Sequence, residues 1–445
     1  MALSDSLLDQ VRNCGVVGSG GAGFPTHVKL AAQVDTLVIN AAECEPVLVT
    51  DQWLTISAAA DVVDGIRAVA RQVGAGRIVI GIKEHYHAMI AALRPHLAGA
   101  PAIEFHFFQD FYPAGDEHVM VHDITGRIVP EGGIPLDVGV VVQNVSTMHA
   151  VRRAMFDQPF IRKAVTVAGE VARPGVYEAP IGMSAAEVIN AAGGSTLDRF
   201  EVIDGGPMMG GLQKSIEDPV IKTTAGYIVL PPDHHVVRAR KVPDRTALRR
   251  TSAVCCQCRM CTDMCPRFLL GHRIEPHQAM RGILAGREVS KDVMAMAWLC
   301  SQCGVCEEYA CDMGLSPKHI FKLMKERLVA EGKKNPCHER PETAMEQNGW
   351  IRVPKARLTR RLGLASYLLP HSGEIRVLRD PWLVRIPLKQ HAGAPSIPVV
   401  TVGDAVRAGQ LIGEIPEGRL GARIHASISG VVRDVAGGVV TIERS

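Results

Sequence analysis

Nine of the twelve cysteines in this 445-residue chain lie between positions 255 and 311, in a pattern suited to metal–sulfur chemistry. Eight of them form two runs: Cys255, Cys258, Cys261 and Cys265, followed by Pro266, and then Cys300, Cys303, Cys306 and Cys311. Three cysteines separated by two residues can bring three thiolates from one loop to one face of a cube-shaped cluster, while the fourth ligand comes from elsewhere. The two runs therefore predict two [4Fe–4S] clusters.

The spacing of the first run, C-x2-C-x2-C-x3-C-P, is typical of a pair of clusters in which the last cysteine of each run binds the other cluster. We therefore expect Cys311 to complete the first triplet and Cys265 to complete the second. Two zinc sites are the alternative, but four ligands per zinc would leave the third cysteine of each triplet unexplained. Cys256 is in register with neither run, and we interpret it as a bystander. Two such clusters conduct electrons, so the chain should also hold an electron source.

A glycine-rich segment, GVVGSGGAGFPTHVKL (15–30), is the candidate for that source. Gly18, Gly20 and Gly23 have G-x-G-x-x-G spacing, with Glu43 twenty residues after Gly23. This dinucleotide fingerprint is weak alone, because only two apolar residues precede the glycines. Glycines let backbone N–H groups approach a phosphate, and Lys29 adds a positive charge. The segment predicts a phosphate-binding loop, with a turn that serves packing alone as the alternative.

The elements around this loop alternate between strands and helices. The patterns predict strands at 35–40, 77–82, 103–108 and 138–145, and helices at 54–73, 85–97 and 146–155. Polar residues gather where these strands end, which is where open α/β sheets bind ligands. The N-terminal part is therefore expected to be an α/β domain with its ligand at the strand ends.

The overall composition narrows the class of protein. At 445 residues the chain should form two to four domains, and its 47% hydrophobic residues are typical of a globular protein. The net charge of +3 argues neither for nor against nucleic acid, and no nucleic acid partner is predicted. The basic run 238–250 is interpreted as a solvated linker. No signal peptide and no run of about eighteen apolar residues is found, so we expect a cytoplasmic or peripheral protein without a transmembrane segment.

Several motifs together resemble a known family. The segments GSGGAGFPTHVK, NAAECEP, YPAGDE (112–117) and VVQNVST (141–147) resemble the flavin site of the NADH-oxidising subunit of respiratory complex I. With GGPMMGG (205–211), the SLBB-like stretch 164–194 and the paired cysteine runs, they resemble the C subunit of the Rnf complex still more closely. In that subunit the barrel-sandwich module comes first, whereas here it comes last (400–432). This order resembles the cobalamin reductases of propanediol-utilising bacterial microcompartments.

The resemblance implies FMN as cofactor and NADH as substrate, with roles for particular residues. The FMN phosphate would lie at Gly18, Gly20, Gly21 and Lys29, the isoalloxazine edge at Asn40 and Glu43, and the ribityl phosphate end at Asn144 and Thr147. The loop between flavin and nicotinamide would contain Tyr112, Gly115, Asp116 and Glu117, and NADH would contact Phe24, Glu45 and Glu117. Three departures weaken the match to NADH: Ala42 and Cys44 replace an acid and a serine, and no second phenylalanine follows Lys29.

The resemblance also implies a multidomain α/β architecture. The expected parts are an FMN/NADH-binding α/β domain (1–160), an SLBB-like β-grasp domain (161–236), a helical ferredoxin-like domain with two [4Fe–4S] clusters (237–336), a linker (337–380) and a barrel-sandwich domain (381–445). No lysine follows Lys389, so the last domain cannot carry an attached cofactor as lipoyl and biotinyl domains do.

The function implied is an NADH-dependent reductase that delivers electrons to cob(III)alamin or cob(II)alamin for a cobalamin adenosyltransferase. Its location would be the cytoplasm, inside a bacterial microcompartment, with shell or enzyme proteins as possible partners. No catalytic residue is predicted. The alternatives are an Rnf-type subunit that exchanges electrons with ferredoxin and a non-catalytic assembly scaffold.

Overall fold

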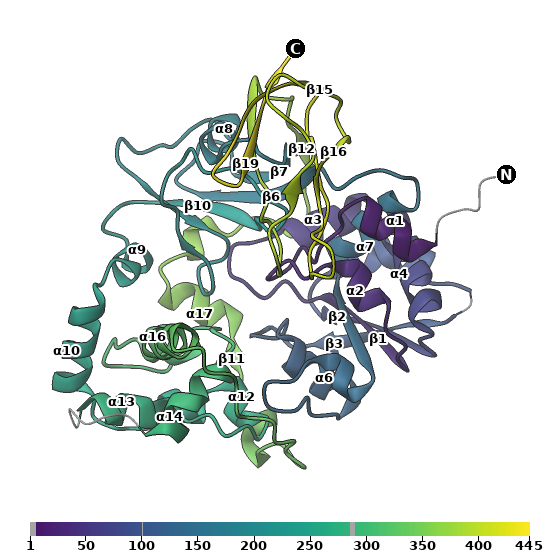
Figure 1. Ribbon diagram of the computed structural model, residues 1–445. Coiled ribbons are helices and arrows are strands. Elements are labelled where there is room, and N and C mark those ends of the chain that lie inside the picture. Colours follow the sequence, from purple (N-terminus) through teal and green to yellow (C-terminus); the bar gives the residue numbers. More distant parts are fainter. Residues whose placement is uncertain (1–5, 100, 285–289) are drawn as a thin grey trace.

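The computed structural model describes residues 6–99, 101–284 and 290–445. In Figure 1, which is coloured along the sequence, consecutive stretches of the chain form the separate domains of the molecule. We refer to residues 6–160 as the N-terminal domain, 161–236 as the middle domain, 237–336 as the cysteine domain and 381–445 as the C-terminal domain. These limits are the ones predicted from the sequence.

The N-terminal domain is a parallel sheet with helices on both faces. Its sheet has the order β3-β2-β1-β5, formed by β1 (Thr36–Ala41), β2 (Arg77–Lys83), β3 (Ile103–Phe108) and β5 (Val140–Asn144). Its helices are α1 (Leu7–Asn13), α2 (Thr26–Leu30), α3 (Thr50–Ser57), α4 (Ala59–Val73), α5 (His87–Leu93), α6 (Glu117–Thr125) and α7 (Val145–Ala154). Side chains alternate along β1, so that Leu37 and Ile39 pack with α4 and α7 while Val38 packs with α6. The four predicted strands are β1, β2, β3 and β5, and the helices predicted at 85–97 and 146–155 correspond to α5 and α7. The helix predicted at 54–73 is divided between α3 and α4, because the backbone of Ala58 is not helical.

The middle domain is built on a six-stranded sheet of mixed direction, in the order β12-β7-β6-β10-β8-β9. Its own elements are β6 (Arg162–Gly169), β7 (Gly175–Pro180), α8 (Ala185–Ala191), β8 (Glu201–Asp204), β9 (Gly211–Leu212) and β10 (Gly226–Leu230). Ser184 and Glu187 form a capping box at the start of α8, which satisfies backbone groups at that helix end.

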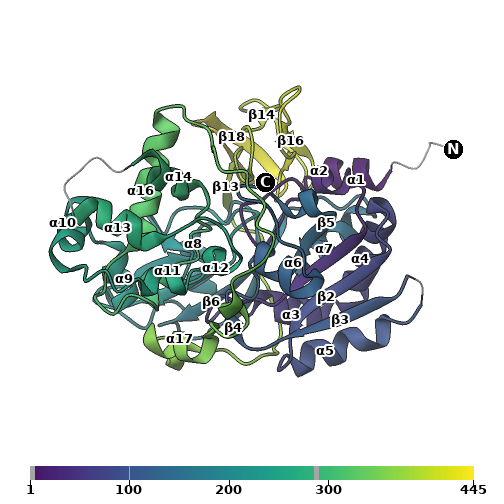
Figure 2. The same ribbon diagram turned by 90° about the horizontal axis from the view of Figure 1, so that it is seen from below.

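The cysteine domain consists of short helices joined by the cysteine loops. They are α9 (His235–Arg240), α10 (Asp244–Val254), α11 (Met260–Asp263), α12 (Pro266–Leu269), α13 (Pro276–Leu284), α14 (Lys291–Ala295), α15 (Val305–Glu308) and α16 (Pro317–Ala330). Figure 2 shows α10, α13, α14 and α16 on the opposite side of the molecule from β3 and α5. The basic run 238–250, interpreted as a linker, belongs to α9 and α10.

Residues 337–380, predicted to be a linker, contain three paired or packed elements. β11 (Val353–Pro354) pairs with β4 (Phe111–Tyr112) of the N-terminal domain, and β12 (Arg376–Val377) pairs with β7. Between them lies α17 (Lys355–Arg361). Val353 and Leu358 are buried in one cluster with Tyr112, Met208 and Cys303. This segment therefore joins three domains, because its apolar residues complete a core that the three share.

The C-terminal domain packs two small sheets around one core. β13 (Leu383–Pro387), β19 (Val439–Arg444), β18 (Gly430–Ala436) and β15 (Ala405–Val406) form one sheet, and β14 (Ile397–Pro398), β16 (Leu411–Glu414) and β17 (Ile424–His425) form the other. Lys222 ties this domain to the others, since its Nζ donates to the carbonyls of Gly15 (2.6 Å) and Arg423 (2.8 Å). Within the described ranges, none of the helices has both the length and the apolar character of a membrane span.

Candidate flavin and iron–sulfur sites

The carboxyl ends of β1 and β5 bring two predicted flavin-site asparagines side by side. Asn40 and Asn144 are paired in register across the two strands. Asn40 Nδ2 donates to the Gly115 carbonyl at 2.9 Å, so it fixes the loop after β4. Asn144 caps α7 through its side-chain oxygen, and its Nδ2 donates to Asp51 Oδ2 at 2.7 Å. The strand ends thus hold three of the predicted segments together.

The glycine-rich loop lies against the start of α7. Ser19 N donates to Thr147 Oγ1 at 3.0 Å, which brings the loop next to that predicted residue. A Cβ added to Gly20 would lie 2.7 Å from Asn144 Nδ2, whereas one added to Gly21 would meet no protein atom within 4 Å. Gly20 is therefore required by protein packing, and Gly21 leaves free space beside the loop. This arrangement is suited to a phosphate that approaches backbone N–H groups.

Lys29 already has two partners. Its Nζ lies 3.0 Å from Glu117 Oε1 and 3.1 Å from the Val142 carbonyl. The Phe24 ring centroid is 6.0 Å from the same nitrogen. Lys29, Glu117 and Phe24, which were predicted to contact FMN or NADH, thus form one group.

Glu43 is directed at a helix start. Its carboxylate accepts hydrogen bonds from the backbone N–H groups of Asp51 (2.9 Å) and Gln52 (3.2 Å) at the beginning of α3. Burial, together with the negative charge of Asp51, raises the pKa of Glu43 to about 7. Lys355 of α17 donates to the Glu43 carbonyl at 3.0 Å, and burial lowers the pKa of this amine to about 8. Sequence reasoning missed Lys355 because it lies in the predicted linker.

Lys163 is a second amine that sequence reasoning missed. It lies at the start of β6, is 5% exposed, and donates one long hydrogen bond, 3.4 Å, to the Ser19 carbonyl. Within the described part of the chain, no carboxylate oxygen lies within 4.0 Å of its Nζ. Lys163 lines a cavity with Ser19 and Ser146. A buried amine beside the glycine-rich loop can hold a phosphate; the signal was a lysine that opens an apolar strand.

The predicted cluster ligands line two separate cavities. Quartet 1 comprises Cys255, Cys258, Cys261 and Cys311, and quartet 2 comprises Cys265, Cys300, Cys303 and Cys306. These are the two groups that the exchange of the fourth cysteine predicts. Cys256 lines the same cavity as quartet 1 and is exposed.

The donor set of these cavities is suited to an iron–sulfur cluster. Burial raises the pKa of Cys261, Cys265 and Cys303 to about 12, so these thiols need a nearby cation to become thiolates. Bound iron supplies that positive charge, and four thiolates are the usual ligands of a [4Fe–4S] cluster.

Quartet 2 contacts the flavin-site loops directly. The Tyr112 hydroxyl donates to the Cys303 carbonyl at 2.7 Å, and Tyr112 is only 1% exposed. Arg267, two residues after Cys265, donates to Asp116 Oδ1 at 2.5 Å, and Asp116 also caps α6. The predicted residues Tyr112 and Asp116 therefore connect the two sites.

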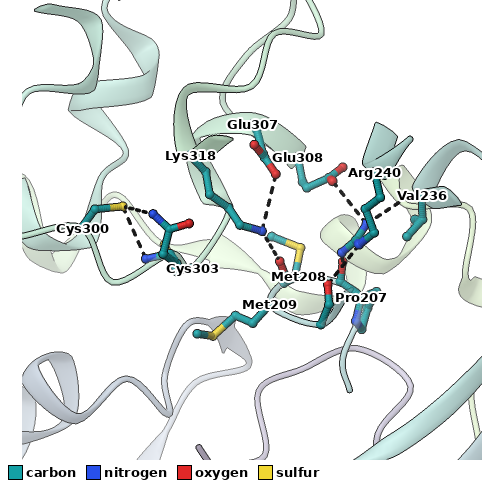
Figure 3. A network of polar contacts seen from close by, with 12 residues as sticks. Pro207, Met208, Met209, Val236, Arg240, Cys300, Cys303, Glu307, Glu308 and Lys318 are labelled. Carbon is teal, nitrogen blue, oxygen red and sulfur yellow. Dashed lines mark hydrogen bonds and ion pairs between the residues drawn. The ribbon is translucent and has the colours of Figure 1, made fainter. Parts of the chain in front are cut away.

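A second connection passes through the GGPMMGG loop (Figure 3). Glu45, predicted to contact NADH, accepts hydrogen bonds from the backbone N–H groups of Met208 and Met209, both at 2.9 Å. Lys318, which lines the cavity of quartet 2, donates to the Met208 carbonyl at 2.8 Å and lies 3.5 Å from Glu307. The loop is thus held by an acid from the flavin side and an amine from the cluster side.

Models of four protein families match the chain. They are the Nuo51 FMN-binding domain (residues 11–153), the SLBB domain (164–211), the 4Fe-4S dicluster domain (254–316) and the RnfC barrel sandwich hybrid domain (369–444). Together with the cavities described above, these matches define a multidomain flavin and iron–sulfur electron-transfer protein, with FMN and [4Fe–4S] clusters as its cofactors. The predicted fold class and cofactors are confirmed.

Two full-length relatives identify the family. The chain is 42% identical to the cobalamin reductase PduS of Citrobacter freundii, over 99% of this chain and 97% of the relative. It is 43% identical to the cobalamin reductase PduS of Salmonella typhimurium, over 100% of this chain and 98% of the relative. The chain belongs to the PduS cobalamin reductase family, as its module order predicted.

More distant similarities cover less of the chain. The C subunit of the ion-translocating oxidoreductase complex of Citrobacter koseri is 36% identical over 61% of this chain and 37% of its own length. A solved structure of an NAD+-reducing [NiFe]-hydrogenase in the H2-reduced state is 22% identical, with a TM-score of 0.49, and covers 73% of this chain and 61% of that one.

Proposed function

We propose that this protein transfers electrons from NADH to cob(III)alamin or cob(II)alamin. One NADH yields NAD+, a proton and two electrons, which reduce two cob(III)alamin molecules to cob(II)alamin or two cob(II)alamin molecules to cob(I)alamin. When bound, FMN accepts the hydride and the clusters carry electrons singly. Membership of the PduS family supports the acceptor. The observation that carries the proposal is the direct contact between Tyr112 of the flavin side and Cys303 of quartet 2.

The residues of this chain would bind, space and orient the cofactors. Gly18, Gly20, Gly21, Asn40, Glu43, Asn144 and Thr147 are proposed to surround FMN, and the two quartets to ligate the clusters. Lys163 would pair with the FMN phosphate, since its amine lies beside the glycine-rich loop with one weak hydrogen bond. Quartet 2 is the nearer to the flavin loops, so the cluster that it would hold is expected to receive electrons before the one at quartet 1.

NADH as the direct donor is part of the proposal. Phe24 and Glu117 lie near Lys29 at one side of the predicted flavin site. Glu45 is engaged by Met208 and Met209, so a dinucleotide that bound Glu45 would have to displace these N–H groups. A reduced ferredoxin is the alternative donor, as the resemblance of the motifs to the Rnf C subunit implies.

One rapid-mixing experiment tests donor and acceptor together. The reconstituted protein is mixed anaerobically with NADH and cob(III)alamin, and the absorbance of flavin and corrinoid is followed. The expected result is flavin bleaching followed by formation of cob(II)alamin. Bleaching without corrinoid reduction would contradict the acceptor, and bleaching by reduced ferredoxin but not by NADH would contradict the donor.

We also propose a cytoplasmic location inside a bacterial microcompartment, with a cobalamin adenosyltransferase as the recipient of the reduced corrinoid. The module order shared with cobalamin reductases supports both. Co-sedimentation with purified microcompartments and pull-down of the adenosyltransferase test them, and recovery with the membrane fraction would favour the ion-translocating alternative.

A further inference from the structure

An open groove lies beside the cysteine cavities. It has a free volume of about 570 Å³, against about 30 Å³ for the cavity of quartet 1. This volume is within the range of roughly 300–1,000 Å³ that small-molecule sites occupy. Its walls include Met260, Met264 and Tyr309 from the cysteine domain and Arg357, Arg360 and Arg361 from α17.

The groove is adjacent to quartet 1 along the chain and in space. Met260 precedes Cys261, and Ala310, which precedes Cys311, lines both the groove and the cavity of quartet 1. A molecule in the groove would therefore be close to the cluster that is farther from the flavin loops. This is the place where an electron could leave the protein.

Two of the groove's cations are free to bind a ligand. Arg361 lies 3.3 Å from Asp312 Oδ1 and donates to the Glu308 carbonyl, so its charge is paired. Arg357 and Arg360 are exposed, and neither side chain makes a hydrogen bond or ion pair with the described residues. Guanidinium groups match the geometry of phosphate oxygens. The groove thus combines a net positive wall with methionine and tyrosine side chains.

We propose that this groove binds cobalamin, with Arg357 and Arg360 on the phosphodiester of its nucleotide loop. The apolar edge of the corrin would contact Met260, Met264 and Tyr309. This inference rests on the proposed function, because cobalamin must be the acceptor. The thioether and phenol groups in the wall offer apolar contact to the corrin edge beside the guanidinium groups of Arg357 and Arg360, and this combination favours the corrinoid over an acidic protein surface.

Binding can be tested apart from electron transfer. Equilibrium dialysis with cyanocobalamin is compared between the wild-type holoprotein and the Arg357→Gln/Arg360→Gln variant. The variant should bind at least about tenfold more weakly, because two charge-assisted hydrogen bonds to phosphate are lost. The matched control is Arg407→Gln/Arg419→Gln, which removes the same charge from exposed positions of the C-terminal domain and should bind as the wild type does. FMN content, thermal unfolding and the electron paramagnetic resonance of the reduced clusters should be unchanged in both.

A second ligand identifies the group that the arginines contact. Cobinamide lacks the nucleotide loop and its phosphodiester, so the wild type should prefer cyanocobalamin to cobinamide and the groove variant should lose that preference. Unchanged binding of cyanocobalamin in the groove variant would overturn the inference. The inference would also be overturned if the groove variant bound cyanocobalamin as the wild type does but no longer bound an acidic partner protein. If the wild type binds cyanocobalamin through this groove yet never reduces cobalamin, the proposed function fails and the binding site stands.

Discussion

At the scale of single residues, Lys163 shows how burial can prepare a side chain for an anion. Burial lowers the pKa of this amine to about 8, although the charges of Asp51 and Glu43 act in the opposite direction. The amine is therefore partly neutral in mildly alkaline solution. A phosphate beside it would supply the missing counter-charge and favour the protonated form.

Replacing Lys163 by methionine should weaken FMN binding by about ten- to a hundredfold, the range for a charge-assisted hydrogen bond. Riboflavin, which has no phosphate, should bind equally well to both proteins, and Lys163→Arg should keep most of the FMN affinity. In the wild type, FMN affinity should fall as the pH rises above about 8, because the free amine loses its proton there. Fluorescence titration of the apoprotein measures each affinity, and equal loss of FMN and riboflavin binding would contradict a phosphate contact.

Gly20 and Gly21 form a matched pair of positions. Alanine at Gly20 would meet Asn144 at 2.7 Å, so Gly20→Ala should lower both the melting temperature and FMN content. Alanine at Gly21 meets no protein atom, so Gly21→Ala should keep the melting temperature of the apoprotein and still lower FMN affinity. Calorimetry and flavin release measure these effects. Normal FMN binding by Gly21→Ala would show that the cofactor does not approach this residue.

Alanine substitutions distinguish the cysteines that ligate iron from Cys256, which is predicted not to ligate it. Cys258→Ala and Cys303→Ala should each reduce the iron content from about eight to about four atoms per chain, as expected for the loss of one of two [4Fe–4S] clusters. Cys256→Ala should retain about eight, although Cys256 lines the same cavity as quartet 1. Iron analysis after anaerobic reconstitution decides, and a loss of iron in Cys256→Ala would place this cysteine among the ligands.

At the scale of elements, the GGPMMGG loop depends on Glu45. The carboxylate accepts hydrogen bonds from two backbone N–H groups, and burial raises its pKa, so this acid depends on both donors. In Glu45→Gln an amide NH2 would face one of these donors, so the variant should be destabilised by about 1–3 kcal/mol. Glu117→Gln, whose partner Lys29 is on the other side of the site, serves as the control and should change stability little. Denaturant unfolding of both variants makes the comparison.

The sequence predicted the elements whose residues follow a regular period. The strands at 77–82 and 103–108 and the helix at 146–155 are β2, β3 and α7 within a few residues, because their apolar residues repeat with the spacing of buried faces. The segment 337–380 has no such repeat. β11 and β12 are two residues long and exist only because β4 and β7 offer edges to them. Pairing partners more than 190 residues away in the sequence leave no local signal.

At the scale of the whole molecule, the sequence predicted the residues of the flavin and cluster sites separately. It did not predict the contacts that connect the two sites. Cysteine spacing predicted both quartets, and the resemblance predicted the flavin segments. The contacts Tyr112–Cys303, Asp116–Arg267 and Lys355–Glu43 join positions far apart in sequence. Each is a single side chain that reaches a single atom, so no pattern of residue types could reveal it. The roles of Tyr112 and Asp116 as links between the sites come from the structure alone.

The pairing of β11 with β4 also has a consequence for the timing of synthesis. Tyr112 leaves the ribosome 241 residues before its partner Val353, which at a rate of about 5–20 residues per second takes roughly 12–50 seconds. During that interval all eight cluster cysteines are made, while β4, whose Tyr112 contacts the Cys303 carbonyl, still lacks its partner strand. Only 47 residues separate Cys306, the last cysteine of quartet 2 to be made, from Val353, which corresponds to roughly 2–9 seconds. The pairing of β11 with β4 is therefore formed after every cysteine of both quartets is available.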